Sequence, residues 1–308
     1  MITKALFDTS LRTTWDNVLV NNAIHAPFFT YQWHELWYEV LGKDWQPYVL
    51  VVDDVIIAPF ARKDDEVIFS GGEEISDYQD LIGPDEKKID VWKQLLEFLK
   101  RDGVTSIRLR NVPQSSPTVP FFQQLPNATV TQEDTTPLMH LPSSWEAYVE
   151  SLPYKNRHEL RRKIRKFERE HTNVQIIESS NPPQDSNTLL LLMRKDKKKT
   201  AFLTPEMTLF FQKLAEVFKD SISLLVLTME NEPAAATLSF IHNEASLLYN
   251  SGFDKTCCPN AGWYLKAMSI KKAIEKSLKQ YNFLQGSEPY KYDLGGGDFF
   301  VYTIYLRL

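Results

Sequence analysis

The chain has 308 residues, a length that corresponds to about two domains. Hydrophobic residues make up 43% and charged residues 24% of it, which is the composition of a globular protein rather than a disordered or fibrous one. The formal net charge of −5 argues against non-specific binding to DNA. The apolar runs are too short for a membrane span, and the Met1–Asp8 segment lacks the pattern of a signal peptide. We therefore expect a cytoplasmic protein.

The first half of the chain predicts three short strands, a helix and a fourth strand. The strands are expected at 48–52, 55–61 and 66–69, the helix at 85–101 and the last strand at 106–110. Runs of β-branched and aromatic residues separated by turn residues are typical of a meander, and a strand–helix–strand unit is typical of a crossover. An aromatic stripe around Trp33 and Trp37 predicts a further helix that packs on this sheet.

A stretch rich in proline and serine, residues 112–142, separates this half from the next. We place the domain boundary there and predict an N-terminal domain at 1–140 and a C-terminal domain at 141–308. A serine before Trp145 is typical of a helix start.

Two clusters of basic residues follow. Residues 155–169 predict a helix whose apolar positions Leu160, Ile164 and Phe167 face a core, while its cations face solvent or an anionic partner. The second cluster, residues 194–199, favours exposed lysines at the end of a helix over a binding role. Both clusters leave open whether an anionic substrate or a nucleic acid is bound.

The second half repeats the arrangement of the first. Strands are expected at 224–229, 234–241 and 245–252, then a helix from about Gly262 and a strand at 281–284. The helix begins with Asn260, Ala261 and Gly262, and a helix start presents free N–H groups and the positive end of the dipole, which suit a phosphate. An ordinary helix cap is the alternative interpretation. The two copies together predict an α+β fold with two mixed sheets.

The cysteines and histidines predict neither a disulfide nor a metal site. Cys257 and Cys258 are adjacent, which disfavours a bridge between them, so we expect reduced thiols in a loop. The six histidines are scattered without the spacing of metal ligands.

The segments Asn260–Leu265 and Tyr281–Lys291 resemble the GNAT-type acetyltransferase domain of the family around the cellulose-biosynthesis protein CelD. That family has a Ser-Pro-Gly helix opening and a Phe-Leu-Arg-Gly-x-Glu-x-Tyr-Lys strand end; here Ala261 replaces the proline and Gln285 the arginine. The segment Ser76–Asp80 resembles the family's Ser-Asp-Tyr-x-Asp, so that the resemblance covers nearly the whole chain. The family is related to the Fem-type transferases, which also have two GNAT-like halves but use aminoacyl-tRNA.

The resemblance implies two tandem GNAT-like domains, each a mixed, mainly antiparallel sheet flanked by helices. It also implies acyl transfer from acetyl-CoA or another acyl-CoA to an amine. In GNAT folds the pantetheine lies where two strands splay apart, and the diphosphate lies on the following helix start. By this likeness Asn260, Ala261 and Gly262 would hold the diphosphate, and Tyr249, Asn250 and Ser251 would lie along the pantetheine.

Catalytic and acceptor residues are expected in two places. Glu288 is the expected base, Tyr290 could protonate the thiolate, and Lys291 could bind an acceptor carboxylate or phosphate. A structural ion pair between Glu288 and Lys291 is the alternative. Asp77, Tyr78 and Asp80 are expected on the acceptor side, with a local turn as their alternative.

The function that we expect is acyl-CoA-dependent N-acyl transfer to a small amine, such as an amino sugar or an amino-acid-like group in polysaccharide or envelope metabolism. Aminoacyl-tRNA-dependent transfer is less favoured, because no long coiled-coil arm is evident. A noncatalytic scaffold of a synthase complex is a third hypothesis, supported by the departures at Ala261 and Gln285. The sequence predicts neither the acceptor nor the oligomeric state.

Overall fold

The computed structural model describes residues 1–171, 173–256 and 258–308, which form two compact units. Unit 1 consists of Met1–Thr135 and Phe299–Leu308, and unit 2 of Thr136–Asp298. The division lies close to the boundary predicted after residue 140, but the C-terminal segment returns to unit 1. Its strand β13 (Phe300–Arg307) pairs with strands of unit 1 rather than extending the second domain.

Unit 1 contains a seven-stranded sheet in the order β1-β2-β3-β4-β5-β13-β6. The strands are β1 (Ile2–Ala5), β2 (Gln46–Val52), β3 (Ile56–Lys63), β4 (Glu66–Phe69), β5 (Ser106–Pro113) and β6 (Ala128–Thr135). Neighbours are antiparallel except β4 and β5, which are parallel and are joined by α3 (Asp85–Arg101). The predicted meander and crossover of the first half are therefore confirmed.

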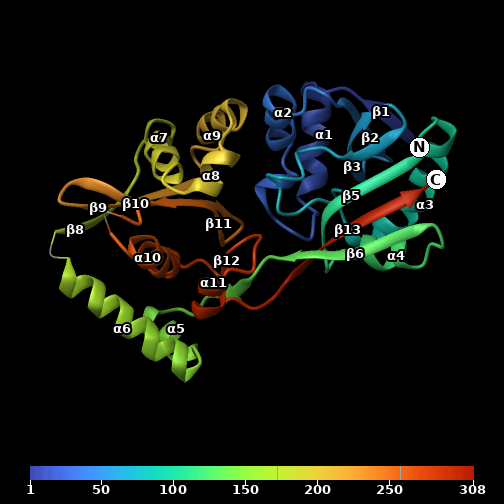
Figure 1. The fold of residues 1–308 in the computed structure, drawn as a ribbon. Coiled ribbons are helices and arrows are strands. Elements are labelled where there is room, and N and C mark those ends of the chain that lie inside the picture. Colours follow the sequence, from blue (N-terminus) through green and yellow to red (C-terminus); the bar gives the residue numbers. More distant parts are fainter. Residues whose placement is uncertain (172, 257) are drawn as a thin grey trace. The chain divides into compact units, whose positions relative to one another are not determined.

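Helices cover both faces of this sheet (Figure 1). On one face, Trp92 of α3 and Phe122 of α4 (Thr118–Gln123) pack in one apolar core with Phe60 of β3. On the other face lie α1 (Thr9–Leu19) and α2 (Tyr31–Val40), preceded by the short helix η1 (Pro27–Phe29). The aromatic stripe is the buried face of α2, as predicted.

Unit 2 contains a six-stranded sheet in the order β7-β12-β11-β10-β9-β8. The strands are β7 (Leu138–His140), β8 (Val174–Glu178), β9 (Ile222–Met229), β10 (Glu232–His242), β11 (Ala245–Phe253) and β12 (Gln280–Asn282). Here β11 and β12 are the parallel pair, and α10 (Ala261–Glu275) connects them. The second copy of the predicted arrangement is thus also present.

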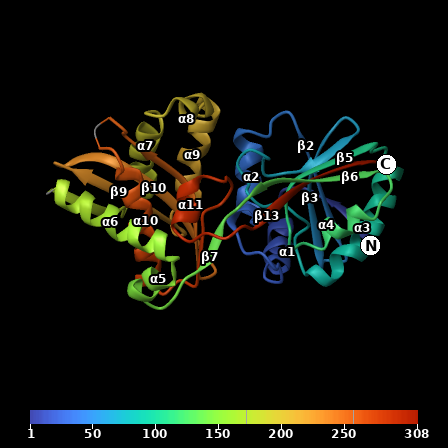
Figure 2. The same ribbon diagram turned by 60° about the horizontal axis from the view of Figure 1, so that its bottom comes forward.

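The helices of unit 2 lie on both faces of its sheet (Figure 2). On one side are α7 (Pro182–Met193), α8 (Lys197–Phe202) and α9 (Pro205–Val217). On the other are α10, α5 (Trp145–Ser151) and α6 (Tyr154–Glu170), and the short α11 (Pro289–Asp293) follows β12. Both units are mixed sheets flanked by helices, so the predicted α+β class is confirmed. None of the helices described here is long and apolar enough to cross a membrane.

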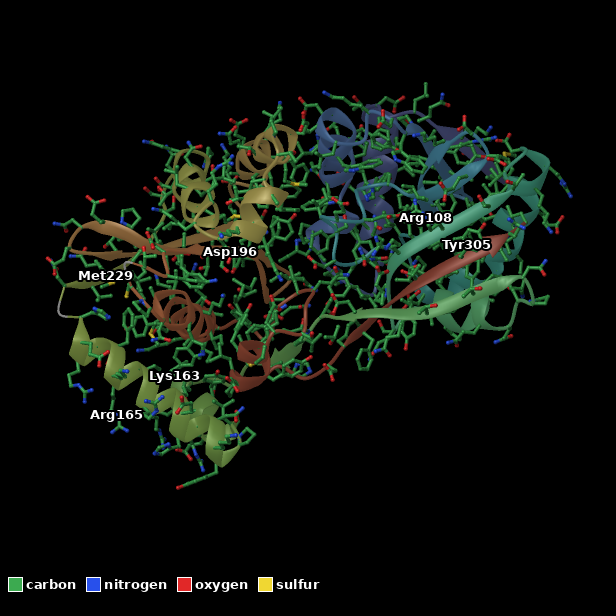
Figure 3. The ribbon with its side chains drawn as sticks, viewed as in Figure 1. Arg108, Lys163, Arg165, Asp196, Met229 and Tyr305 are labelled. Atoms are coloured by element: carbon green, nitrogen blue, oxygen red, sulfur yellow. The ribbon has the colours of Figure 1, made fainter. Side chains whose placement is uncertain are left out.

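The basic helix α6 is amphipathic, as its sequence predicts. Leu160 and Phe167 are buried, and the Phe167 ring stacks on Tyr264 of α10 with 4.2 Å between centroids. The ammonium of Lys163 lies 4.7 Å from the centre of the Trp263 ring. Arg165, by contrast, lies on the outer side of the helix (Figure 3).

Candidate functional site

The two parallel strands of unit 2 separate soon after they begin to pair. In the described structure β11 pairs with β12 from Ala245 to Leu247, whereas β11 continues to Phe253. Next to this point β10 pairs Leu238 with Asn250 and Ser239 with Leu248, so that Tyr249 is an extra residue in β11. Such a bulge bends a strand and ends regular pairing. The second half of β11 therefore has no strand partner among the described residues on the side where β12 departs, and we call this unpaired edge the opening.

The start of α10 packs against the end of β11. Asn260 is exposed and has a left-handed backbone (φ 76°), and the helix begins at the next residue. Gly262 is buried, and a Cβ added there would lie 2.6 Å from the Phe253 ring. Only glycine allows this close approach of helix and strand. The residues predicted for the cofactor, Tyr249–Ser251 and Asn260–Gly262, thus come from two elements that contact one another, and their roles stay predictions.

Lys291 is a buried anchor of the turn that follows β12. Its ammonium donates to the carbonyl oxygens of Leu284 at 2.9 Å and Gln285 at 2.5 Å, and it pairs with the Glu288 carboxylate at 3.0 Å. The side chain of Lys291 is 2% exposed and that of Glu288 55%. The ion pair considered as an alternative is therefore present, and it leaves the Glu288 carboxylate accessible from solvent.

The environment of Glu288 decides what this carboxylate can do. Partial burial raises its pKa, but the charge and the hydrogen bond of Lys291 outweigh this effect, so that the pKa lies below its ordinary value. Glu288 consequently stays ionised at neutral pH. It can hold a substrate ammonium and accept a proton once the nitrogen has been acylated.

Tyr290 stays protonated in the free protein and is suited to donate a hydrogen bond. Burial, followed by the charge of Glu288, raises the pKa of its hydroxyl above the ordinary value. A hydroxyl that remains protonated can hydrogen-bond to a thiolate as it leaves.

Two lysines beside the opening were not assigned to the site from sequence. Lys199 of α8 donates to the carbonyl oxygen of Ser251 and, at 3.3 Å, to Oδ1 of Asn250. Lys266 of α10 points to the rings of Tyr290, at 4.2 Å, and Phe253, at 5.7 Å. Burial is the main cause that lowers the pKa of both ammonium groups, that of Lys266 to about 8. For Lys199 the sequence-based expectation of an exposed lysine in the cluster 194–199 is therefore wrong.

The residues predicted for the acceptor lie in unit 1, where two of them are buried. The Asp80 carboxylate accepts from Lys88 at 2.7 Å, Ser116 at 2.6 Å and Thr118 at 2.7 Å. Tyr78 is buried, with its ring edge-on to Phe299, and Asp77 is partly buried. Their role toward an acceptor stays a prediction, while the contacts of Asp80 give it a structural role in the core of unit 1.

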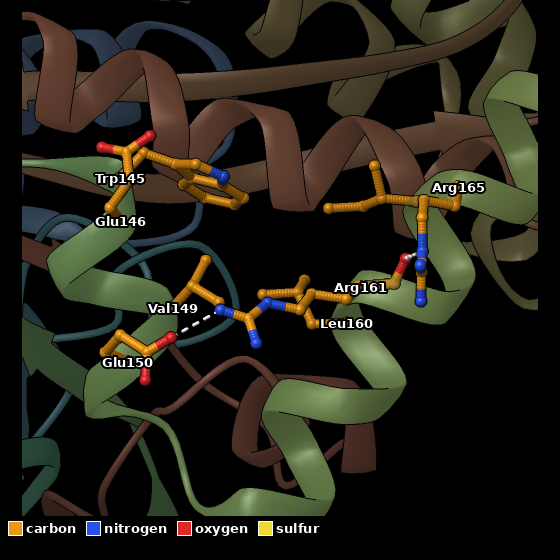
Figure 4. A pocket seen from close by; sticks show the side chains of 8 residues that line it. Trp145, Glu146, Val149, Glu150, Leu160, Arg161 and Arg165 are labelled. Atoms are coloured by element: carbon orange, nitrogen blue, oxygen red, sulfur yellow. Dashed lines mark hydrogen bonds and ion pairs between the residues drawn. The ribbon is translucent and has the colours of Figure 1, made fainter.

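A cavity of about 450 Å³ lies elsewhere in unit 2, between α5 and α6. Its wall is apolar at Trp145, Val149 and Leu160, and Arg161 and Arg165 lie at its rim (Figure 4). Arg161 is already bound to Glu150 at 2.5 Å. None of the predicted site residues lines this cavity.

The cysteines and histidines add no evident chemistry. Cys258 is buried with its Sγ 3.6 Å from Nε2 of His171, whereas Cys257 lies outside the described residues. Among the residues that the structure describes, no three His, Cys, Asp or Glu side chains gather as metal ligands would.

Comparison with protein families bears directly on unit 2. Residues 154–292 match the family model described as acetyltransferase (GNAT) domain. This part of the chain is a GNAT-type acetyltransferase domain. It contains the opening, the start of α10, and the two lysines Lys199 and Lys266. A search of curated proteins finds no matching sequence.

Solved structures with the same fold cover almost the whole chain. FemX aligns over 100% of this chain and 97% of its own, with a TM-score of 0.67 and 10% identity. The C-terminal domain of a putative lysylphosphatidylglycerol synthetase from Agrobacterium fabrum aligns over 96% and 90%, with a TM-score of 0.62 and 10% identity. A tandem GNAT protein from the clavulanic acid biosynthesis pathway aligns over 99% and 97%, with a TM-score of 0.57 and 9% identity. At these identities the likeness concerns the fold, which is the predicted tandem GNAT arrangement.

Proposed function

We propose that the protein transfers an acyl group from an acyl-CoA, such as acetyl-CoA, to the amine of a small molecule. The observation that carries the proposal is the opening between β11 and β12 next to the start of α10. A thioester arm can lie along the unpaired edge of β11, where its amides find backbone partners. The diphosphate then meets the positive end of the α10 dipole.

The side chains at the opening have complementary roles in this reaction. The amine nitrogen attacks the thioester carbonyl carbon, the carbon–sulfur bond breaks, and the sulfur leaves as a thiolate. Glu288 holds the acceptor and takes the proton from its nitrogen, while Tyr290 passes its proton to the thiolate and regains one, by way of solvent, from Glu288. Lys291 fixes the turn that carries both residues. As part of the same proposal, the protein is a relative of the CelD family, and its acceptor is an amino sugar or an amino-acid-like group.

An aminoacyl-tRNA donor is the second candidate, and the charge of α6 favours it. Arg165 has no carboxylate within ion-pair distance among the described residues, and it lies on the outer face of the helix (Figure 3). Lys166 and Arg169 on the same helix are also exposed and share the single carboxylate of Glu170. A phosphate backbone binds such a surface with an affinity that falls steeply as salt rises. FemX, whose fold is similar, is a Fem-type protein, the class that uses this donor.

Substitution of Asn260 by aspartate tests the position of the donor. The change adds a negative charge at the exposed helix start without altering side-chain size, so it should weaken acetyl-CoA binding about tenfold. The helix itself should be unharmed, since aspartate is a good helix cap. Affinity would be measured by isothermal titration calorimetry and folding by the melting temperature.

The matched control is Asn243→Asp, which makes the same change at another exposed residue with positive φ, in the turn between β10 and β11. It should leave affinity unchanged. Equal affinities of the two variants would remove the α10 start from the donor site. If acetyl-CoA does not bind while aminoacyl-tRNA binds in a salt-dependent way, the second candidate is correct.

A further inference from the structure

A buried lysine without a counter-ion lies beside the opening. Lys266 is 7% exposed, and its ammonium makes no hydrogen bond or ion pair with any residue in the described parts of the chain. The ammonium lies over the rings of Tyr290 and Phe253. Aromatic faces stabilise a cation only modestly, and less than the burial of an unpaired charge destabilises it. A group that is missing from the free protein is therefore expected next to this ammonium.

Unit 1 shows how a buried lysine on the other crossover helix is neutralised. Lys88 lies in the first turn of α3, the crossover helix of unit 1, and like Lys266, which lies in the second turn of α10, it is buried. Its ammonium contacts the carboxylates of Asp80 at 2.7 Å and Asp85 at 2.8 Å. The crossover helix of unit 2 carries its buried lysine without either carboxylate. The contrast indicates that in unit 2 an anionic group of a ligand, rather than a side chain, neutralises the buried lysine.

The charged groups around Lys266 also leave an excess of positive charge. The groups whose charges act on Lys266 are the ammoniums of Lys199, Lys255 and Lys291 and the carboxylate of Glu288. Glu288 is paired with Lys291, and Lys255 is paired with Asp196 at 2.9 Å. Lys199 donates to the neutral oxygens of Asn250 and Ser251. Two positive charges, those of Lys199 and Lys266, therefore remain without a carboxylate of their own.

We propose that Lys266 and Lys199 form an anion subsite at the open side of β11 that binds a phosphate or carboxylate group of a substrate. The assignment of that substrate to the acyl donor or to the acceptor rests on the proposed function, whereas the subsite itself does not. Both the diphosphate of an acyl-CoA and an acidic acceptor amine offer the required charge. Substrates without a negative group should be used poorly.

Proton uptake is a direct signature of such binding. Burial and then the charge of Lys199 lower the pKa of Lys266 to about 8, against the raising effect of Glu288. An anion beside Lys266 stabilises its charged form and raises this pKa. At about pH 8 the lysine is half neutral, so anion binding should take up about half a proton per site. At about pH 6 the lysine is already charged, and no uptake is expected.

The experiment adds sulfate, a dianion that does not titrate in this range, at constant ionic strength and records proton uptake by pH-stat. Wild-type protein should take up protons near pH 8 and not near pH 6. Lys266→Met should show no uptake and about tenfold weaker sulfate binding. Lys266→Arg, whose charge is permanent, should bind sulfate within about threefold of wild type but without uptake. Lys271→Met, on the same helix, is the control and should behave as wild type.

Two further ligands identify the source of the anion. Uptake with CoA but not with pantetheine, which has the same thiol arm without phosphates, assigns the subsite to the donor. Uptake with sulfate but with neither of these assigns it to the acceptor. Sulfate-linked uptake in a protein that does not bind CoA would leave the subsite standing and remove the CoA donor. Equal uptake by wild type and Lys266→Met would overturn the subsite.

Discussion

Replacement of Lys291 by methionine should lower the free energy of unfolding by about 2–4 kcal/mol, because it leaves buried carbonyl groups and a carboxylate without their donor. Glu288→Gln should have a small effect on stability, since its side chain is half exposed and the amide can still accept a hydrogen bond from Lys291. The same change removes the proton-accepting carboxylate and should reduce turnover about a hundredfold or more. Stability would be measured by urea denaturation and turnover by CoA release with a responsive amine.

The control for the lysine is Lys276→Met, which breaks a more exposed pair with Glu178 and should cost under about 1 kcal/mol. Equal losses of stability from Lys291→Met and Glu288→Gln would mean that the ion pair alone explains both residues. Near-normal turnover of Glu288→Gln in a folded protein would remove Glu288 as the base.

Replacement of Asp80 by alanine should destabilise unit 1 by about 3–5 kcal/mol, because it leaves the buried ammonium of Lys88 with a weakened counter-charge and two hydroxyl groups without an acceptor. Trp92 donates to Thr118, which in turn donates to Asp80, so the fluorescence of this tryptophan should report the loss. The control Asp90→Ala breaks an exposed pair with Lys93 and should change stability by less than about 1 kcal/mol. An unchanged midpoint of unfolding with reduced acceptor use would instead assign Asp80 to the acceptor site.

The repeated elements could be predicted because their signals are local. The helix 85–101 and the strand 66–69 have the predicted bounds. Acidic residues in the first turn and basic residues in the last turn mark the helix, and a short run of apolar residues marks the strand. The return of β13 to unit 1 could not be predicted in this way. Its pairing with β5 and β6 depends on contacts across the whole chain, and an exposed or half-buried strand carries no mark of its partner.

The site shows the same difference between local and long-range signals. The motif around Glu288 and Lys291 identified the turn after β12, because a short run of residues carries it. Lys266 was missed because a lysine on a helix is usually exposed. One signal was available: Lys266 lies one turn after Gly262 and one turn before Ile270, on a stripe of buried residues where no solvent-facing lysine is expected. Its meaning depended on contacts with Tyr290 and Phe253 that only the fold brings together.

Hydrogen–deuterium exchange of the full chain with and without saturating acetyl-CoA tests the donor site most directly. A donor bound along β11 and on the helix start should slow exchange in residues 249–253 and 260–263 and leave β8 and β9 unchanged. Protection of that kind, lost in Asn260→Asp, is the result that we predict. Saturation without protection there, or protection confined to the cavity between α5 and α6, would contradict the account.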